Sequence, residues 1–453
     1  MIGIGGTGMC GIAEVLLNLG YQVSGSDLQE NEATIRLKNL GAQIFLGHSP
    51  ENLKEADVVV ISSAVHEDNV EVVRAKTLKI PVIPRAEMLA ELMRMKYGIA
   101  VAGAHGKTTT TSMTAQVLEA GGYDPTIIVG GRLNTIGSNA KLGEGDFIVA
   151  EADESDRSFL YLSPFIAVLT NIDEEHLDQY GSLAEIKKTF VYFANKVPFY
   201  CPVILCLDDR NLRSIMPQIE RKIITYGFST GADIQAKDFE FEGFSSHSTL
   251  YVQGRPAGRL KLNVPGQHNI LNAMAATAVG LDLGIEMGTI IKALEDYSGT
   301  GRRFELKKVV KDIMIIEDYA HHPTEIKATL QAARTGWKRR LVVVFQPHRY
   351  SRLARLKAEF VTAFHQADLL ILTEIYPAGE KPIPGVNGQA LFEDIQRAGQ
   401  TNVWFEPELA RLPDLVAEKL QPGDMLLVLG AGQVNRIIPE VIKILEREKK
   451  NGG

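Results

Sequence analysis

Short runs of apolar residues recur along the chain, and each leads directly into glycine or polar residues. Such runs are typical of strands buried in a parallel sheet. The strands predicted in this way are Ile99–Ala102, Phe147–Ala150, Ile166–Thr170, Val203–Leu207, Ile313–Ile316, Leu341–Phe345, Leu369–Leu372 and Met425–Leu429. Because the carboxyl ends of parallel strands share one edge of their sheet, the polar residues after these runs should line ligand-binding crevices.

The first glycine cluster predicts a phosphate-binding turn. Gly3, Gly5 and Gly8 fit the pattern G-x-G-x-x-G, and the stretch from Met9 to Leu19 predicts a helix directly after it. A second predicted strand, Tyr21–Asp27, ends in an acid about 20 positions beyond Gly8, where a ribose hydroxyl is commonly bound. The pattern indicates a nucleotide ligand and leaves open whether this is a dinucleotide cofactor or a nucleotide-linked substrate.

Two further features of this segment affect the prediction. A buried strand is predicted at Asp57–Ala64, where Ser62 and Ser63 would either line the ligand crevice or form a simple turn. Only Met1 and Ile2 precede the glycines, whereas strands usually run for about five or six residues. We therefore expect either a stunted first strand or a true start upstream of Met1.

The stretch from Gly103 to Thr110 predicts a second phosphate site. It follows the strand Ile99–Ala102 and opens a segment, Ser112–Ala120, that is predicted to be helical. Backbone N–H groups and the helix dipole converge on an anion at such a turn; Lys107 would reach the β- and γ-phosphates, and Thr108 would hold Mg²⁺. The standard motif has a glycine where this chain has Val101, so the alternatives are a shortened loop and an ordinary strand-to-helix turn.

Carboxylates follow the next predicted strands. Glu151 and the acidic residues up to Asp156 follow Phe147–Ala150, and a second acidic segment, ending in His176, follows Ile166–Thr170. In a parallel sheet, Lys107, Thr108, Glu151 and His176 would come together at one edge. Carboxylate oxygens suit Mg²⁺, which also binds phosphate oxygens, so these residues are metal candidates unless they belong to an acidic surface loop.

Amides and basic residues mark further candidate sites. Asn269 and Asn272 face the same way near the start of a predicted helix and could contact a nucleobase, although Asn269 could equally cap the helix. Arg349 and Arg352 lie beside His348 after a predicted strand and could bind a carboxylate or phosphate, or form a solvated basic face.

A histidine pair follows another strand. His321 and His322 precede a proline, and no third ligand has suitable spacing nearby. We therefore predict a positioning role for this pair and not a zinc site.

The length and the order of these units predict the domain organisation. At about 150 residues per domain, 453 residues correspond to about three domains. We predict an α/β protein with a Rossmann-like N-terminal domain, a central domain of the P-loop ATPase type and a Rossmann-like C-terminal domain. The expected ranges are residues 1–96, 97–300 and 301–453.

Composition narrows the expected partners and location. A net charge of −7 argues against nucleic acid and favours small molecules. Cys10, Cys201 and Cys206 have no metal-ligand spacing, are expected to be buried, and by their odd number fit a reducing compartment. No charged-then-apolar leader opens the chain, and no apolar run approaches the ~18 residues of a membrane span. We expect a cytoplasmic protein without a membrane partner, as a monomer or weak homodimer.

Nucleotide-type α/β units in series, one with a carboxylate-binding site, favour an ATP-driven ligation. Over essentially its whole length the chain resembles the Mur ligase family. The residues that carry the resemblance are Gly3–Met9, Gly103–Thr110, Glu151–Asp156, Thr170–His176, His268–Asn269 with Asn272, Arg302–Phe304, Asp318–Pro323 and Gln346–Tyr350. In that family a shortened phosphate loop is usual, and the first glycine motif holds the UDP part of a sugar nucleotide and not NAD.

The resemblance implies an enzyme of peptidoglycan precursor synthesis. Such an enzyme would use ATP and Mg²⁺ to join L-alanine to the lactyl carboxylate of UDP-N-acetylmuramate through an acyl phosphate. Lys107, His176 and Glu151 would be catalytic, with Thr108, Glu151 and His176 as metal ligands. The implied ATP-binding residues are Gly103, Ala104, His105, Gly106, Lys107, Thr108, Thr109, Asn269, Asn272 and Arg303. The implied UDP-sugar residues are Gly5, Gly6, Thr7, Gly8, Met9, Asp27, Ser62 and Ser63, and the implied amino-acid-binding residues are Tyr319, His321, His348, Arg349 and Arg352.

Departures from the family pattern and competing functions complete the prediction. Ala104, Ala320 and Gln433 stand where Thr, Gly and Asp are common, and Gln433 makes a charged role at that position doubtful. One alternative is the sister ligase that attaches a recycled tripeptide to the same sugar nucleotide. Another is a nicotinamide-dependent dehydrogenase, which would leave Lys107 and Thr108 unexplained; a third is a non-catalytic nucleotide-binding module.

Overall fold

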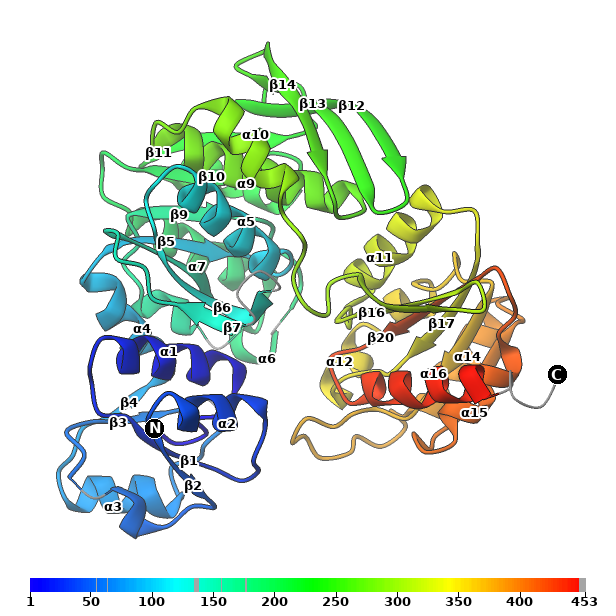
Figure 1. The fold of residues 1–453 in the computed structure, drawn as a ribbon, viewed down its shortest axis with the longest axis horizontal. Coiled ribbons are helices and arrows are strands. Elements are labelled where there is room, and N and C mark those ends of the chain that lie inside the picture. Colours follow the sequence, from blue (N-terminus) through cyan, green and yellow to red (C-terminus); the bar gives the residue numbers. More distant parts are fainter. Residues whose placement is uncertain (54, 63, 134–137, 156, 176, 448–453) are drawn as a thin grey trace. The chain divides into compact units, whose positions relative to one another are not determined.

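The computed structural model describes residues 1–53, 55–62, 64–133, 138–155, 157–175 and 177–447. The chain forms two compact units, and Figure 1 labels most of their helices and strands. The first unit comprises Met1–Phe239, His247–Leu262 and Asn269–Thr300, and the second comprises Glu240–Ser246, Asn263–His268 and Gly301–Gly453. Both units are α/β. The three domain ranges expected from the sequence stay a prediction.

The N-terminal part of the first unit is a small parallel sheet with helices between its strands. Ile2 bridges Ser26 on β1 and Ile61 on β3, and so joins the pair β1–β2 to the pair β3–β4. The stunted first strand therefore appears as a single bridging residue. The elements are α1 (Thr7–Asn18), β1 (Ser24–Asp27), α2 (Glu32–Asn39), β2 (Gln43–Leu46), η1 (Pro50–Leu53), β3 (Val59–Ile61), α3 (Val70–Thr77), β4 (Val82–Pro84) and α4 (Arg85–Arg94).

A ten-stranded sheet forms the rest of the first unit, in the order β14-β13-β12-β11-β10-β9-β5-β8-β6-β7. Its middle strands run parallel. The strands are β5 (Tyr97–Ala102), β6 (Thr126–Leu133), β7 (Ser138–Lys141), β8 (Phe147–Ala152), β9 (Ile166–Leu169), β10 (Pro202–Cys206), β11 (Lys222–Gly227), β12 (Ile234–Glu242), β13 (Ser245–Val252) and β14 (Arg255–Leu262). The helices are α5 (Lys107–Ala120), η2 (Ser158–Tyr161), α6 (Leu177–Tyr180), α7 (Leu183–Asn195), α8 (Arg210–Ile215), η3 (Met216–Gln218), α9 (Gln267–Asp282) and α10 (Met287–Glu295).

Helix α5 begins earlier than predicted, at Lys107 and not near Ser112. The residues Thr108–Thr111 are β-branched and have low intrinsic helix propensity, which is why the sequence suggested a later start. All four are buried in the structure. Tertiary packing thus outweighs local propensity in the first turns of this helix.

The second unit is a six-stranded sheet with the order β15-β16-β20-β17-β18-β19. Only the edge pair β15–β16 is antiparallel among the pairs of this sheet. The strands are β15 (Glu305–Val310), β16 (Ile313–Asp318), β17 (Arg340–Phe345), β18 (Leu369–Leu372), β19 (Val403–Phe405) and β20 (Asp424–Leu429). The helices are α11 (Pro323–Gly336), α12 (Tyr350–Arg355), α13 (Lys357–Val361), α14 (Gly388–Arg397), α15 (Leu412–Lys419), η4 (Val434–Arg436) and α16 (Ile437–Arg447).

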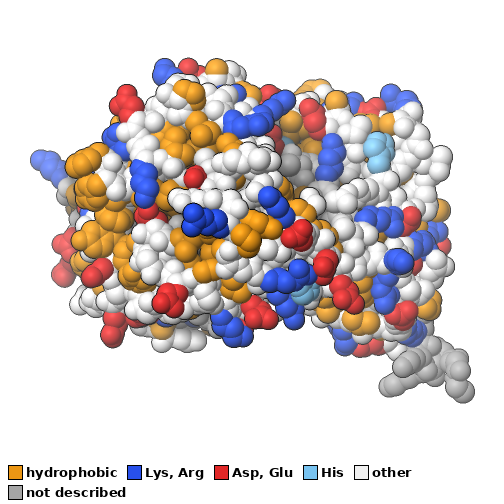
Figure 2. All heavy atoms as spheres, turned by 90° about the horizontal axis from the view of Figure 1, so that it is seen from above, with side chains coloured by type: hydrophobic (Ala, Val, Ile, Leu, Met, Phe, Trp, Pro, Cys, Tyr) orange, Lys and Arg blue, Asp and Glu red, His pale blue; other side chains and the backbone are white. Residues whose placement is uncertain are grey.

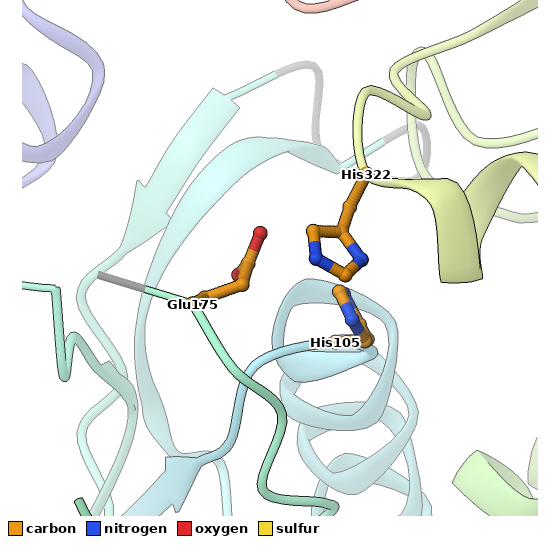
Figure 3. Close-up of side chains that lie close together, drawn as sticks. All are labelled: His105, Glu175 and His322. Carbon is orange, nitrogen blue, oxygen red and sulfur yellow. The ribbon is translucent and has the colours of Figure 1, made fainter. Parts of the chain in front are cut away.

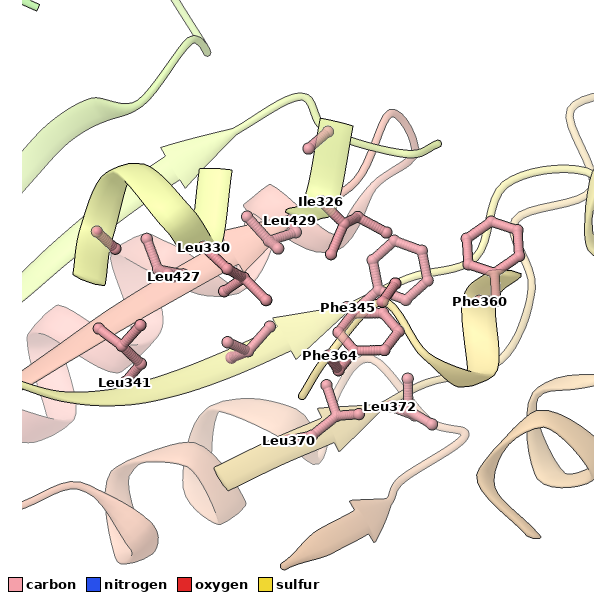
Figure 4. Close-up of a cluster of buried hydrophobic side chains, with 14 of the residues drawn as sticks. Ile326, Leu330, Leu341, Phe345, Phe360, Phe364, Leu370, Leu372, Leu427 and Leu429 are labelled. Atoms are coloured by element: carbon pink, nitrogen blue, oxygen red, sulfur yellow. The ribbon is translucent and has the colours of Figure 1, made fainter. Parts of the chain in front are cut away.

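Two separate hydrophobic cores cover the two faces of this sheet. Leu341, Val343 and Phe345 of β17 point into the core under α11, α13 and α14, which Figure 4 shows in close-up. Val342 and Val344 point the other way, into the core under α15 and α16. Side chains alternate between faces along a strand, so a parallel strand covered on both faces must be apolar throughout. This explains the uninterrupted apolar runs of the sequence.

Charged side chains of both signs are exposed on the surface. Acidic and basic side chains are interspersed over the face seen in Figure 2. In the described part of the chain no helix combines the length and the apolar character needed to cross a membrane. Cys10, Cys201 and Cys206 are buried, as predicted, and form no disulfide within the part of the chain that the structure describes.

Candidate active site

The loop from Gly103 to Gly106 joins β5 to α5 and is held in place by the end of β9. The Thr170 hydroxyl donates to the His105 carbonyl oxygen over 2.7 Å, and the Asn171 side-chain amide donates to the same oxygen over 2.9 Å. The His105 N–H donates in return to the Asn171 side chain, at 2.8 Å. Thr170 and Asn171 belong to one of the family motifs, but the sequence alone predicted no role for them. They act as a clamp on the loop backbone.

Two glycines of the loop have conformations that other residues adopt only under strain. Gly103 has φ +142°, and a Cβ there would lie 2.1 Å from the Thr170 hydroxyl oxygen. Gly106 has φ +83°, and a Cβ there would lie 2.7 Å from the side-chain oxygen of Asn272. The loop backbone therefore passes closer to its neighbours at these two positions than a side chain would allow, and Gly106 leads directly into the N–H groups at the start of α5.

Asn272 also connects α9 to α5. Its side-chain oxygen accepts a hydrogen bond from the Thr110 hydroxyl at 3.1 Å, and its amide donates to the side chain of Asn269 at 3.2 Å. Both asparagines are buried. The structure thus places the two predicted adenine contacts beside the phosphate loop, and their contact with a base stays a prediction.

Lys107 is paired with Glu154. The ammonium nitrogen of Lys107 lies 3.0 and 2.9 Å from the two carboxylate oxygens of Glu154, and it donates to the Gly103 carbonyl oxygen over 2.6 Å. Burial alone would lower the pKa of Lys107, but the Glu154 and Asp153 carboxylates outweigh it and raise that pKa above its ordinary value. Lys107 therefore carries its positive charge at neutral pH, as a phosphate ligand requires.

Glu151, the carboxylate predicted for the metal, has a different partner. It lies opposite Val101 in the pairing of β5 with β8, at the strand end that leads into the phosphate loop. One of its carboxylate oxygens accepts the Gly130 N–H at 2.7 Å. Thr108, in the first turn of α5, is buried. A hydroxyl and a carboxylate at neighbouring strand ends are hard oxygen donors of the kind that Mg²⁺ prefers.

A second group of polar side chains lies at the outer side of the loop. A ring nitrogen of His105 and a carboxylate oxygen of Glu175 lie within 4.8 Å of each other. Figure 3 shows these two side chains. His105 also contacts Asp173, with 3.1 Å between ring nitrogen and carboxylate oxygen. His176, predicted as a catalytic residue and metal ligand, lies outside the described residues, as does Asp156.

The first glycine loop is connected to the acid at the end of β1. The Gly5 N–H donates to the Asp27 carboxylate over 2.8 Å, and the Asn31 side chain donates to the Gly5 carbonyl oxygen over 3.3 Å. Gly6 is the N-cap of α1, so N–H groups at the helix start are directed at this loop. Ser62 packs against Gly3, whose Cβ would lie 3.1 Å from the Cβ of Ser62.

Three other residues belong to the predicted UDP-sugar set, namely Thr7, Met9 and Ser63. The side chain of Met9 is buried in the core, so only its backbone could face a ligand. Ser63 and the side chain of Thr7 lie outside the described residues.

Arg85, which the sequence did not single out, lies beside the same loop. A Cβ on Gly8 would lie 2.7 Å from the Arg85 guanidinium, which also pairs with Asp153 at 3.3 Å. Burial opposes ionisation of Asp153, but Lys107 and Arg85 lower its pKa below the ordinary value. Arg85 begins α4 after an unremarkable strand, so no sequence pattern marked it.

In the second unit, Asp318 organises two segments that carry predicted site residues. Its two carboxylate oxygens accept the N–H groups of Phe304 at 2.8 Å and Ala320 at 2.7 Å. Burial, opposed by Arg303, raises the pKa of Asp318 to about 6. The Arg302 and Arg303 guanidinium groups lie 4.8 and 5.3 Å from the centre of the Tyr319 ring. The predicted ATP residue Arg303 and the predicted amino-acid residue Tyr319 are therefore neighbours.

The predicted amino-acid-binding residues form an aromatic and basic cluster at the ends of β16 and β17. The His321 ring centre lies 5.4 Å from that of Tyr319 and 5.8 Å from that of His348. Arg352 donates to Nδ1 of His348 over 3.1 Å. Arginine only donates, so Nδ1 of His348 is an acceptor and the proton of the neutral ring is on Nε2. Tyr376, which sequence reasoning missed, stacks on His348 with 5.6 Å between ring centres.

Arg349 adopts a strained backbone conformation at the start of α12. Its φ of +68° lies in the left-handed region. Residues other than glycine rarely adopt this conformation, and they do so where the surrounding structure imposes it. Its N–H donates to the Tyr376 carbonyl oxygen over 2.9 Å, and its buried Nε makes no hydrogen bond within the described residues. A buried guanidinium nitrogen with spare donor capacity suits the binding of a carboxylate.

We expect acidification to destabilise the folded chain through His348. Burial, followed by the charges of His321, Arg352 and Arg349, lowers the pKa of His348 from 6.5 to about 3. Between pH 6.5 and about pH 3, His348 is protonated in the unfolded chain and neutral in the folded chain. The free energy of unfolding should therefore fall as the pH decreases. Urea unfolding at pH 7.5 and pH 5 measures this fall.

His348→Gln should reduce that dependence on pH, whereas replacement of the exposed His365 by Gln should leave it unchanged. An equal loss of stability between pH 7.5 and pH 5 in the wild type and in His348→Gln would contradict the assignment.

Two glycine-rich turns before helices, one of them with a partly buried lysine, define the first unit as part of a nucleotide-binding α/β enzyme. Comparison with known proteins gives the family. Residues 1–97 match "Mur ligase family, catalytic domain", residues 101–280 match "Mur ligase middle domain", and residues 302–432 match "Mur ligase, glutamate ligase domain". The chain belongs to the Mur ligase family, and the predicted α/β fold with three family domains is confirmed.

Relatives of high identity extend over nearly the whole chain. It is 56% identical over 445 residues to the UDP-N-acetylmuramate–L-alanine ligase of Geotalea uraniireducens, covering 98% of this chain and 97% of the relative. It is 57% identical to the enzyme of the same name from Geotalea daltonii, covering 96% of this chain and 94% of the relative.

Solved structures give the same fold. The crystal structure of UDP-N-acetylmuramate-alanine ligase from Thermotoga maritima matches with a TM-score of 0.84 at 30% identity, covering 99% of this chain and 98% of that one. A murein peptide ligase from Psychrobacter arcticus matches with a TM-score of 0.72 at 24% identity, covering 98% of each chain.

Proposed function

We infer that this chain is an ATP-dependent ligase that joins L-alanine to the lactyl carboxylate of UDP-N-acetylmuramate, a step of peptidoglycan precursor synthesis. The observation that carries the inference is the 56% identity, over 98% of the chain, to a ligase named for this reaction. The charged lysine in the clamped loop of the first unit supports it, because ligation of a carboxylate needs a phosphate donor.

The proposed ligation has two steps, formation of an acyl phosphate and its conversion to an amide. A carboxylate oxygen of the sugar nucleotide attacks the γ-phosphorus of ATP, the bond to the β-γ bridging oxygen breaks, and ADP leaves. The neutral amine of L-alanine then attacks the acyl phosphate, its nitrogen loses a proton, and the phosphate that leaves from the tetrahedral intermediate can take this proton up. The products are the amide, ADP and phosphate.

Residues of the first unit would bind the nucleotides. The backbone N–H groups from Gly106 to Thr109 would receive the phosphates, and Lys107 would neutralise the charge that develops during transfer. By the family analogy, Thr108 and Glu151 would hold one Mg²⁺ and His176 would assist a second metal, and both ions, when bound, would neutralise phosphate charge. The Gly5–Gly8 loop, with Asp27 and Ser62, would bind the UDP portion.

Residues of the second unit would bind L-alanine. The guanidinium groups of Arg349 and Arg352 would pair with its carboxylate. His348 is neutral and carries its proton on Nε2, so it can donate one hydrogen bond without adding charge. His321 and Tyr319 complete this cluster.

The alternatives have less support. The murein peptide ligase of Psychrobacter arcticus is 24% identical, against 56% for the alanine ligase of Geotalea uraniireducens. A nicotinamide-dependent dehydrogenase would need neither the lysine nor the clamp of the phosphate loop. The oligomeric state and the cytoplasmic location stay predictions.

The reaction itself provides the test. ADP release should require UDP-N-acetylmuramate, ATP and L-alanine together, and chelation of Mg²⁺ should stop it. L-alanine, glycine, L-serine and the L-alanyl-γ-D-glutamyl-meso-diaminopimelate tripeptide are compared as amines. A methyl-sized difference is worth about 1–3 kcal/mol, so glycine and L-serine should react measurably but less efficiently. Release with the tripeptide and none with L-alanine would favour the sister ligase; tight NADH binding without ADP release would favour the dehydrogenase.

A further inference from the structure

The ammonium group of Lys107 already has a full set of partners inside the protein. It lies 2.9–3.0 Å from both carboxylate oxygens of Glu154 and 2.6 Å from the Gly103 carbonyl oxygen. An ammonium has three donors, so these acceptors are sufficient to use all of them. A phosphate at this loop would therefore have to take the place of an existing partner.

Hydrogen bonds to the backbone of Glu154 fix the position of this residue. Its carbonyl oxygen accepts the Tyr180 hydroxyl at 2.6 Å and the Arg157 N–H at 3.1 Å. Next to it, Asp153 is fixed by Arg85 at 3.3 Å and by the Ser155 N–H at 3.0 Å. Glu154 itself is only 4% exposed. The carboxylate is thus a built-in partner of the loop lysine and not a surface residue that reached it by chance.

Carboxylate and phosphate compete for the same ammonium. Both are anions, and when both face one ammonium in a site with little water they repel each other. The lysine gains one partner as it loses the other, so only the difference between the two interactions contributes to nucleotide affinity. Glu151 is not this competitor, because its carboxylate oxygen accepts the Gly130 N–H at 2.7 Å.

We propose that Glu154 is a positioning residue that holds Lys107 in the nucleotide-free loop and is displaced by the β- and γ-phosphates of ATP, so that it lowers the affinity for ATP and ADP. The proposal rests on the inferred ATP site. Glu154 keeps the lysine extended along the loop when no nucleotide is bound, and it favours the release of ADP after the reaction.

The test is the affinity for ADP in Glu154→Gln, measured by isothermal titration calorimetry with Mg²⁺. Glutamine keeps the shape and removes the charge, so ADP should bind about tenfold more tightly than to the wild type. AMP has no β-phosphate, and its affinity should stay unchanged. In turnover, the KM for ATP should fall while kcat stays the same or falls through slower ADP release. A purely structural role of Glu154 would weaken nucleotide binding instead.

A matched control removes another carboxylate–lysine pair of the same unit. Glu119 pairs with Lys141 at 2.5 Å on the far end of α5, so Glu119→Gln should leave both affinities unchanged. If Glu154→Gln does not fold, Glu154→Asp keeps the charge but withdraws it by one methylene and should tighten ADP binding less strongly.

Two results would contradict the proposed role of Glu154. Unchanged or weaker ADP binding in a folded variant overturns the proposal, and so does an equal gain for AMP. If the wild type binds neither ADP nor ATP, the inferred ATP site itself is wrong.

Discussion

Lys107→Ala is expected to abolish ligation and also to destabilise the protein. The lysine is the charged group of the phosphate loop, and removal of one such stabilising group from a transition state lowers kcat by about 1,000-fold. Its loss also leaves the buried carboxylate of Glu154 without its partner, which is 2.9 Å away in the native protein. Breaking a buried pair from one side costs about 3–5 kcal/mol of the free energy of unfolding. ADP release and urea unfolding measure the two effects.

A double variant separates the two effects. Adding Glu154→Gln to Lys107→Ala removes the unpaired charge, so most of the lost stability should return while ligation stays absent. Recovery of activity in the double variant would contradict the catalytic role of Lys107. Equal stability of the single and the double variant would show that the pair does not stabilise the fold.

Gly103→Ala should be nearly as severe, for a steric reason. The added Cβ would lie 2.1 Å from the Thr170 hydroxyl oxygen and 3.0 Å from the backbone nitrogen and oxygen of Asn171. The hydroxyl can turn away, but the backbone of the clamp cannot, so the loop must shift. Displacement of about 1 Å at a reacting centre costs about 100-fold in rate. We expect a rise in the KM for ATP together with a fall in kcat.

Gly122→Ala is the control for the backbone conformation. Gly122 also has a positive φ, +81°, but a Cβ there meets no atom within 4 Å. It should cost about 1 kcal/mol of stability and leave turnover unchanged. If Gly103→Ala behaved like Gly122→Ala, the clamp would not determine the loop geometry.

The strand ends were predictable from the sequence, and the reason is physical. A strand covered on both faces has to be apolar along its length, so β17 and β20 appear as uninterrupted runs that stop where the site begins. The turn between β5 and α5 was predictable because lysine, hydroxyl and glycines lie in fixed order along it, and its binding of phosphate stays a prediction. Three-domain α/β organisation followed from the same signals.

Partner choice within a loop was not predictable. Glu151 and Glu154 belong to one acidic segment, and only the folded backbone shows that Lys107 pairs with the latter while Gly130 bonds to the former. Arg85 comes from a segment without any motif. Tyr376 follows the predicted strand Leu369–Leu372, but its contact with His348 depends on tertiary packing. The start of α5 was misplaced for a similar reason, because burial of its threonines outweighs their low propensity for helix.

The two hydrophobic cores of the second unit also determine where its functional side chains lie. A slip of β17 by one residue against β20 would exchange Phe345 and Val344 between the cores and leave one overfilled and the other hollow. The same slip would move His348 and Arg349 along the sheet edge. If the proposed amino-acid site is at this edge, its geometry depends on side-chain volume in the interior. A volume-changing substitution deep in β17 should then alter the selectivity for the amino acid without contacting it.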